Sequence, residues 1–281
     1  MGALIGCHVP VSRGLVAGAL GYADDVGAEA VQLFVANPRA WALPAPNNAA
    51  ADAFRAAAVD QGRPVYVHSP YLINLGSPTA ETASRSVTAL AHSLATGARI
   101  GARGIVVHTG SAVDPGQRPT ALRQVAALLL PMLDTLPVDA PDVLLEPTAG
   151  QGGSLCGQVA ELEPYLDALG WHPRVGVCLD TCHVFAAGHD LSVPGGVSAL
   201  LADLDRTIGL DRLRLVHAND AKDPCGSHRD RHENIGAGRI GLDPFRELLA
   251  HPAVQNLSVI IETPGRKEGH AHDIGVLKGL R

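Results

Sequence analysis

The sequence lacks the features that mark membrane proteins and repetitive proteins. No window reaches the 18 consecutive apolar residues that a membrane-spanning helix needs. No linker, low-complexity segment or charge run interrupts the 281 residues. Because α/β barrels commonly reach this length as one unit, we expect residues 1–281 to form a single domain. With 46% hydrophobic residues the chain can bury a large core, so we expect a soluble protein without a membrane partner.

Cysteine is scarce, and its spacing shows no paired pattern. There are five cysteines, an odd number without a CxxC motif, and no export signal is apparent. This usage predicts reduced thiols in a cytoplasmic protein. Cys182 lies among candidate metal ligands and could be a nucleophile or a ligand. We interpret it as a small buried thiol, because free cysteine is among the most buried residue types.

Positive charge is also in short supply. The formal net charge is -6, which by itself argues against a polyanionic partner. That argument fails if the protein binds metal, because two or three divalent cations would add roughly four to six positive charges at one place. The charge balance therefore does not exclude nucleic acid as a partner.

Short apolar runs alternate with longer stretches rich in Ala and Leu. This alternation predicts βα units and a parallel sheet, and eight such units favour a closed (β/α)8 TIM barrel over an open sheet. We expect strands over residues 4–7, 30–34, 64–67, 104–107, 143–145, 175–179, 213–216 and 257–261. We expect helices over residues 15–26, 49–61, 79–100, 120–133, 159–169, 197–208, 244–249 and 273–280.

Potential metal ligands directly follow six of the eight apolar runs. The carboxyl ends of barrel strands surround one cavity, so side chains at these positions converge there. A single His after a strand is more often a structural residue, but six candidate ligands at equivalent positions favour a shared metal site at the C-terminal ends of the strands. The six are His68, His108, Glu146, Asp180, His217 and Glu262.

Three more candidate ligands lie between Leu179 and Glu233. His183 comes three residues after Asp180, and Asp230 and His232 project to one side of an extended segment. Imidazole nitrogens together with carboxylate oxygens suit Zn or Mn. Since zinc usually takes about four to five ligands, nine candidates predict two or three metals that share a bridging carboxylate. Clustered metals of this kind are a recurring device for hydrolysing phosphate esters.

These residues and their surroundings resemble the endonuclease IV family of apurinic/apyrimidinic (AP) endonucleases, which are DNA-repair phosphodiesterases. The resemblance covers essentially the whole chain. Its most specific motifs are residues 67–75 (VHSPYLINL), 146–152 (EPTAGQG), 179–183 (LDTCH), 217–220 (HAND) and 226–232 (GSHRDRH).

The resemblance implies a zinc-dependent endodeoxyribonuclease with three Zn2+ ions, for which Mn2+ is a possible substitute. In the implied reaction a metal-bridged hydroxide attacks the phosphodiester 5′ to an abasic site, leaving a 3′ hydroxyl and a 5′ deoxyribose phosphate. Glu146 and Glu262 are the carboxylates expected to orient the attacking water. The implied ligand sets are His68, His108 and Glu146; Glu146, Asp180, His217 and Glu262; and His183, Asp230 and His232.

The resemblance also implies how DNA is recognised. The family bends the duplex and inserts side chains at the lesion, which flips the abasic nucleotide into the pocket. The matching residues here are Arg39, Tyr71 and Leu72. The expected partner is double-stranded DNA containing abasic sites, bound by a monomer without a protein partner. Candidate phosphate contacts in Gly-rich loops near the third metal are Lys222, Arg229, Arg231 and Arg239.

The chain departs from the family pattern at two places beside candidate ligands. Pro147 follows Glu146 where the family commonly has Asn, and Glu233 follows His232 where some members carry a second His. These departures bear on metal occupancy and rate. We expect His8 to contact the metal ligands without binding a metal itself. We interpret the other histidines as surface or packing residues: His92, His172, His189, His228, His251, His270 and His272.

The main alternative is a metal-dependent sugar isomerase or epimerase of the xylose-isomerase-like barrels. Those enzymes use a Glu, Asp, His, Glu set like the one around Glu146, so this set alone does not decide. The further set of His183, Asp230 and His232 supplies a metal site that such isomerases do not need. A non-catalytic lesion-binding protein is disfavoured as well, because it should have lost ligands and all nine are present.

Overall fold

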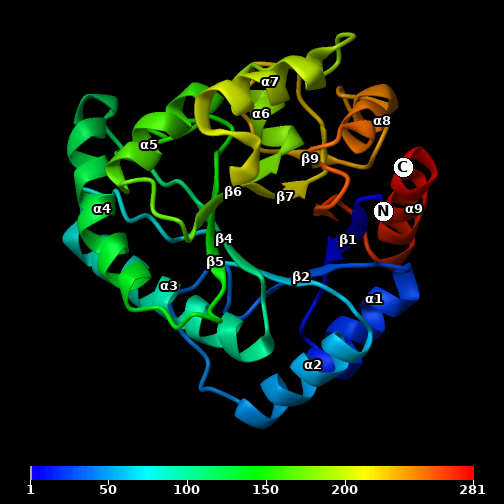
Figure 1. The fold of residues 1–281 in the computed structure, drawn as a ribbon, viewed down its shortest axis with the longest axis horizontal. Helices are drawn as coiled ribbons and strands as arrows, with labels where there is room; N and C mark the ends of the chain where they lie inside the picture. The colour runs from blue at the N-terminus through cyan, green and yellow to red at the C-terminus, as the bar shows by residue number, and fades with distance from the viewer. Residues whose placement is uncertain (1) are drawn as a thin grey trace.

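A closed barrel of eight parallel strands forms the centre of the computed structural model, which describes residues 2–281 (Figure 1). Around the barrel the strands follow the order β1, β10, β7, β6, β5, β4, β3, β2. The predicted barrel is confirmed, and each strand differs from its predicted range only at its ends. The strands are β1 (Leu4–His8), β2 (Val31–Phe34), β3 (Val65–His68), β4 (Gly104–His108), β5 (Asp142–Glu146), β6 (Val175–Asp180), β7 (Leu213–His217) and β10 (Ser258–Ile261).

Helices surround the barrel on its outside (Figure 1). All predicted helices are present, but the last begins at Lys267, earlier than expected, and the first opens with a π-helical segment, η1 (Leu15–Leu20). Among residues 2–281, no helix is both long and apolar enough to cross a membrane. The main helices are α1 (Gly21–Val26), α2 (Asn48–Asp60), α3 (Ala80–Ile100), α4 (Arg118–Asp134), α5 (Leu162–Ala168), α7 (Gly196–Ile208), α8 (Leu242–Ala250) and α9 (Lys267–Leu280).

The core has two parts. The larger part lies between the strands and the helices, and the smaller part fills the inside of the barrel. Because parallel strands are buried on both faces, their sequences are almost continuously apolar, which is why the short runs identified them. The side chains inside the barrel are Ala30, Tyr66, Val106, Leu144, Cys178, Leu215 and Ile260.

Two short elements near the strand ends are absent from the prediction. Helix α6 (Thr181–Ala187) starts directly after β6, because the Asp180 side chain accepts a hydrogen bond from the His183 backbone N–H at 3.0 Å and caps the helix. Strands β8 (Asp220–Ala221) and β9 (His232–Glu233) pair antiparallel above the barrel. Both elements are too short to show a period in the sequence.

Strand register places candidate ligands next to one another. In the pairing of β4 with β5, His108 lies opposite Glu146. In the pairing of β6 with β7, Asp180 lies opposite His217. The barrel itself therefore aligns four of the candidate ligands at its C-terminal end.

Gly6 lets β1 and β2 approach closely, and we expect the substitution Gly6→Ala to destabilise the barrel. A Cβ at this position would lie 2.0 Å from the Ala30 carbonyl oxygen, a backbone atom that cannot move alone. We expect a loss of about 1–3 kcal/mol in the free energy of unfolding, measured by chemical denaturation. As a control, Gly275→Ala on α9 meets no atom within 4 Å and should change stability by no more than about 1 kcal/mol, in the stabilising direction. Equal effects of the two substitutions would contradict this account of Gly6.

Candidate metal centre

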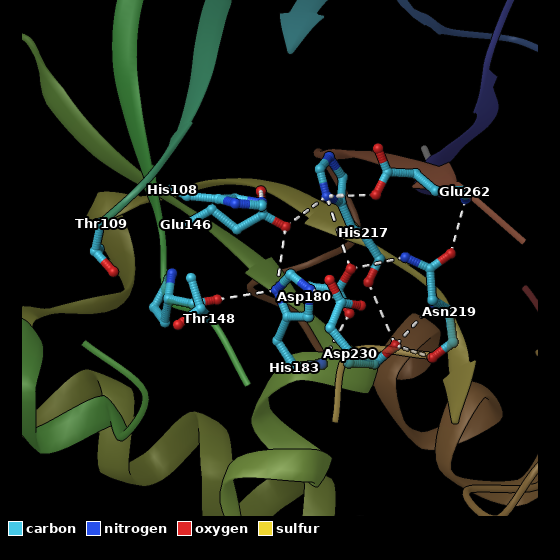
Figure 2. Close-up of polar contacts among 12 residues, drawn as sticks. His108, Thr109, Glu146, Thr148, Asp180, His183, His217, Asn219, Asp230 and Glu262 are labelled. Carbon is cyan, nitrogen blue, oxygen red and sulfur yellow. Dashed lines mark hydrogen bonds and ion pairs between the residues drawn. The ribbon is translucent and has the colours of Figure 1, made fainter. Parts of the chain in front are cut away.

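Glu146 lies at the centre of the candidate site, at the end of β5. Its side chain is completely buried, and its two carboxylate oxygens face His68, His108 and His217. Figure 2 shows His108 and His217 beside it. The distances are 3.2 Å from Oε2 to His68 Nε2, 3.3 Å from Oε2 to His108 Nε2, and 2.9 Å from Oε1 to His217 Nδ1. One carboxylate therefore connects side chains from four strands.

The nine predicted ligands are brought together as three groups. Within each group, one possible ligand atom from each residue lies within 4.8 Å of every other. These groups coincide with the sets that the family resemblance implies, and Glu146 belongs to two of them. The groups are His68, His108 and Glu146; Glu146, Asp180, His217 and Glu262; and His183, Asp230 and His232.

The third group brings two imidazole nitrogens to one carboxylate oxygen and could hold a metal ion. His183 Nε2 and His232 Nε2 lie 3.2 and 3.1 Å from the same oxygen, Asp230 Oδ1. Both nitrogens are buried, yet neither has a hydrogen bond of acceptable geometry to any described residue. Buried polar atoms normally have partners. Two imidazole nitrogens and a carboxylate that converge in this way match the ligands that zinc prefers.

Neighbouring charges in the site shift the pKa values of its carboxyl groups and imidazoles. Burial favours the neutral form of Glu146, but the neighbouring histidines, His217 above all, outweigh it and hold the pKa of this carboxyl well below its usual value. Burial opposes protonation of His183, but the Asp180 and Asp230 carboxylates raise its pKa well above 6.5. Without metal, the proton on His183 therefore offsets part of the negative charge of the carboxylates. A bound cation would replace this proton.

Asn219 connects two candidate ligands, and sequence reasoning assigned it no role. Its side-chain Nδ2 donates to Asp180 Oδ2 at 2.7 Å, and its Oδ1 accepts from the Glu262 backbone N–H at 2.7 Å (Figure 2). Its place directly after the apolar run of β7, between His217 and Asp220, was the available signal in the sequence.

Asp220 is a second residue that the sequence analysis missed. Its buried carboxylate accepts hydrogen bonds from five backbone N–H groups. Four of these belong to the loop of residues 236–241, which follows β9. Asp220 thereby holds the loop against the hairpin that carries His232.

The structure shows what the two departures from the family pattern contact. The Pro147 backbone carbonyl accepts a hydrogen bond from His183 Nδ1 at 3.0 Å. Any residue at this position supplies a carbonyl, so replacement of Asn by Pro keeps this contact. The side chain of Glu233 accepts from the Asn234 backbone N–H at 3.1 Å and shapes the turn after β9.

Two further sequence interpretations concern Cys182 and His8. Cys182 is fully buried, burial raises the pKa of its thiol, and its Sγ lies 3.6 Å from the Arg231 carbonyl. A protonated thiol in this position agrees with a packing role. His8 Nδ1 lies 3.4 Å from Glu262 Oε1, which places this ring behind a candidate ligand, as expected.

The residues predicted to bind DNA lie around the mouth of the barrel. Tyr71 is 46% exposed, and its ring stacks on His108 with 5.7 Å between the ring centroids, whereas Leu72 is half-buried. The Tyr71 backbone N–H donates to the Pro38 carbonyl at 3.0 Å, so the exposed Arg39 lies on a loop attached to that of Tyr71.

The predicted basic contacts form a second cluster near β9. Lys222, Arg229, Arg231 and Arg239 are all exposed. The guanidinium group of Arg231 donates to both oxygens of Asp223, including Nε to Oδ2 at 2.5 Å. Because this pair is already formed, a phosphate would have to compete with Asp223 for Arg231.

Comparison with known proteins agrees with this geometry. The family described as "Xylose isomerase-like TIM barrel" matches residues 20–280. A Streptomyces coelicolor protein named "Probable endonuclease 4" is 57% identical over 99% of this chain and 95% of its own length. The crystal structure of endonuclease IV from Thermus thermophilus superposes with a TM-score of 0.86 at 34% identity, covering 99% of this chain and 98% of that one.

The chain belongs to the endonuclease IV family. The recognition made from the sequence is thus confirmed, and with it the prediction of an endonuclease of the hydrolase class. A D-tagatose 3-epimerase-like protein also superposes, with a TM-score of 0.74 over 99% of this chain and 96% of that one. At 16% identity this likeness shows a shared fold alone.

Without metal, this endonuclease IV family member should lose stability as the pH rises from 6.5 to 9. Burial lowers the pKa of His232, but Asp180 and the other nearby carboxylates outweigh burial and raise this pKa from 6.5 to about 9. A group whose pKa is raised on folding stabilises the folded state fully at pH values below its unfolded-state pKa. This stabilisation is lost as the pH rises past its folded-state pKa. The contribution is on the order of 3 kcal/mol.

Chemical denaturation of chelator-treated protein at several pH values measures this effect. The His232→Gln variant should show a shallower decrease over the same pH window. An equal decrease in the wild type and the variant would show that His232 is not responsible for the loss of stability with rising pH.

Proposed function

We propose that the protein is an AP endonuclease that hydrolyses the phosphodiester 5′ to an abasic site in double-stranded DNA, leaving a 3′ hydroxyl and a 5′ deoxyribose phosphate. We further propose that it acts in the cytoplasm as a single-domain monomer. The observation that carries the proposal is the third ligand group, His183, Asp230 and His232, placed beside two groups that share Glu146. A sugar isomerase needs no such third group, whereas phosphodiester hydrolysis by clustered metals uses it.

The nine ligands would hold three Zn2+ ions, with Mn2+ as a substitute. When bound, such metals supply Lewis acidity that lowers the pKa of water and neutralises charge on the phosphate. Glu146 and Glu262 are the proposed catalytic carboxylates, because the Glu146 side chain is completely buried in the site and the Glu262 side chain is only 13% exposed. Despite that burial, neighbouring histidines, above all His217, lower the pKa of both groups. Both therefore stay ionised at neutral pH and can orient a water molecule by accepting its hydrogen bonds.

The mouth of the barrel supplies the proposed DNA contacts. Tyr71 and Leu72 would enter the duplex at the lesion, and Arg39 on the attached loop would contact the backbone. Across the site, the exposed Lys222, Arg229, Arg231 and Arg239 would bind phosphates. Bound divalent cations would offset the net charge of -6 where the DNA approaches.

The proposal predicts metal-dependent incision at a single abasic-site analogue. Metal-replete protein should cut the labelled strand 5′ to the analogue, and chelator-treated protein should not. His183→Ala should release one metal per chain, because His183 is a ligand of the third group alone, and lower incision by orders of magnitude. Gel assays and metal analysis of the same samples measure both effects.

A histidine outside the site provides the control for that experiment. His172 lies just before β6, near Asp134, so His172→Ala should keep both the metal content and the activity. Full activity of His183→Ala would remove the third group from the mechanism. If the metal-loaded wild type left abasic DNA intact, an assay with sugar substrates would test the isomerase alternative.

Tyr71→Ala should weaken binding to abasic duplex more than binding to undamaged duplex. Its half-exposed ring is positioned to fill the space beside a displaced nucleotide, and undamaged DNA offers no such space. Stacking on a base contributes about 1–3 kcal/mol, so we expect the preference of the protein for abasic over undamaged duplex to fall by about 5- to 150-fold. Fluorescence anisotropy with both duplexes measures it.

The matched control is Val138→Ala, at a 99% exposed residue in the loop before β5, on the opposite end of the barrel. This variant should bind both duplexes like the wild type. If Tyr71→Ala weakens binding to both duplexes equally, Tyr71 is a packing residue.

A further inference from the structure

Gln32 is a buried polar residue on a strand that is otherwise apolar. It is the one polar residue of β2, whose sequence is VQLF, and its side chain is fully buried. Strand β2 contributes none of the nine candidate ligands. A buried amide of this kind requires hydrogen-bonding partners, and their identity indicates its role.

All the hydrogen-bond partners of the Gln32 side chain lie at the candidate metal centre. Its Oε1 is 2.8 Å from His217 Nε2, and its Nε2 donates to Glu262 Oε1 at 2.7 Å. The same Nε2 lies 3.1 Å from His8 Nδ1. Strands β2 and β7 are not neighbours in the barrel, so this side chain reaches across the barrel mouth to His217. One amide thus contacts two candidate ligands of the same group.

The orientation of the amide follows from Glu262. A carboxylate accepts hydrogen bonds only, so the amide NH2 must face Glu262 and the amide oxygen must face His217. That oxygen accepts only, which requires a proton on His217 Nε2. The other ring nitrogen, Nδ1, is then the one available to a metal, and it faces Glu146 Oε1 at 2.9 Å and Glu262 Oε2 at 3.3 Å.

The same contact selects the ligand atom of Glu262. Because Oε1 accepts from Gln32, the carboxylate keeps Oε2 directed toward His217 Nδ1. Side chains that hold ligands in this way often determine metal affinity as strongly as some ligands do.

We propose that Gln32 is a positioning residue for the metal centre, which fixes the tautomer of His217 and the orientation of Glu262 so that both direct one ligand atom to the same metal. The inference rests on the proposed metal site and adds a residue that touches neither metal nor DNA.

The test compares Gln32→Met with Gln124→Met. Methionine keeps the approximate volume of glutamine but removes the hydrogen bonds to His217, Glu262 and His8. Gln124 on α4 also donates two hydrogen bonds, to the Leu75 and Ser77 carbonyls, but it lies outside the barrel. Zn2+ affinity is measured by competition with a chromophoric chelator, and zinc per chain is measured on the same samples. We expect Gln32→Met to bind at least one zinc about 10- to 100-fold more weakly, and Gln124→Met to bind like the wild type.

A second variant and a spectrum keep the test decisive if Gln32→Met does not fold. Gln32→Asn keeps an amide that is one methylene too short to reach both partners, so it should show a similar loss. In zinc-loaded wild type, nitrogen NMR should show His217 with its proton on Nε2, and this signal should be lost in the variants. Wild-type affinity and an unchanged His217 signal in a folded variant would overturn the inference. If the wild type itself bound no zinc, the proposed function would fail instead.

Discussion

The structure of the site depends on one buried carboxylate. Glu146 is completely buried at the end of β5, yet histidines from three other strands hold it in its ionised form. Removal of such a charge from water is costly unless opposite charges or hydrogen bonds compensate for it. Two of these histidines, His68 and His217, have raised pKa values despite their burial, so their protonated rings compensate for the charge. A bound cation would provide the same compensation. The convergence of the barrel strands on Glu146 is therefore an electrostatic requirement as well as a geometric one.

A layer of neutral side chains holds the charged ligands in position. Asn219 connects Asp180 to the backbone of Glu262, and Gln32 connects His217 to the Glu262 side chain. Both amides donate on one side and accept on the other, so each can join ligands of different chemical type. The centre is thus held from two directions, by β2 on one side and by the segment after β7 on the other.

The third group of ligands depends on short elements rather than on the barrel. Asp180 caps α6 and thereby places His183 on its first turn, while Asp220 holds the loop that follows the hairpin of His232. The same family of folds includes barrels with other activities, as the likeness to an epimerase-like protein shows. In this chain, the third ligand group is therefore carried by the elements at the strand ends and not by the shared barrel.

The sequence by itself determined the barrel and the family. Strands buried on both faces appear as short apolar runs, and six of the nine candidate ligands directly follow such a run, so periodicity and residue type were sufficient to find the strands and these six ligands. Only the tertiary structure decided how these residues meet. Strand register places His108 opposite Glu146, α6 and the hairpin are too short to leave a periodic pattern, and Gln32 contacts His217 across the barrel. These contacts join residues far apart in the chain, and local sequence carries no information about such pairs.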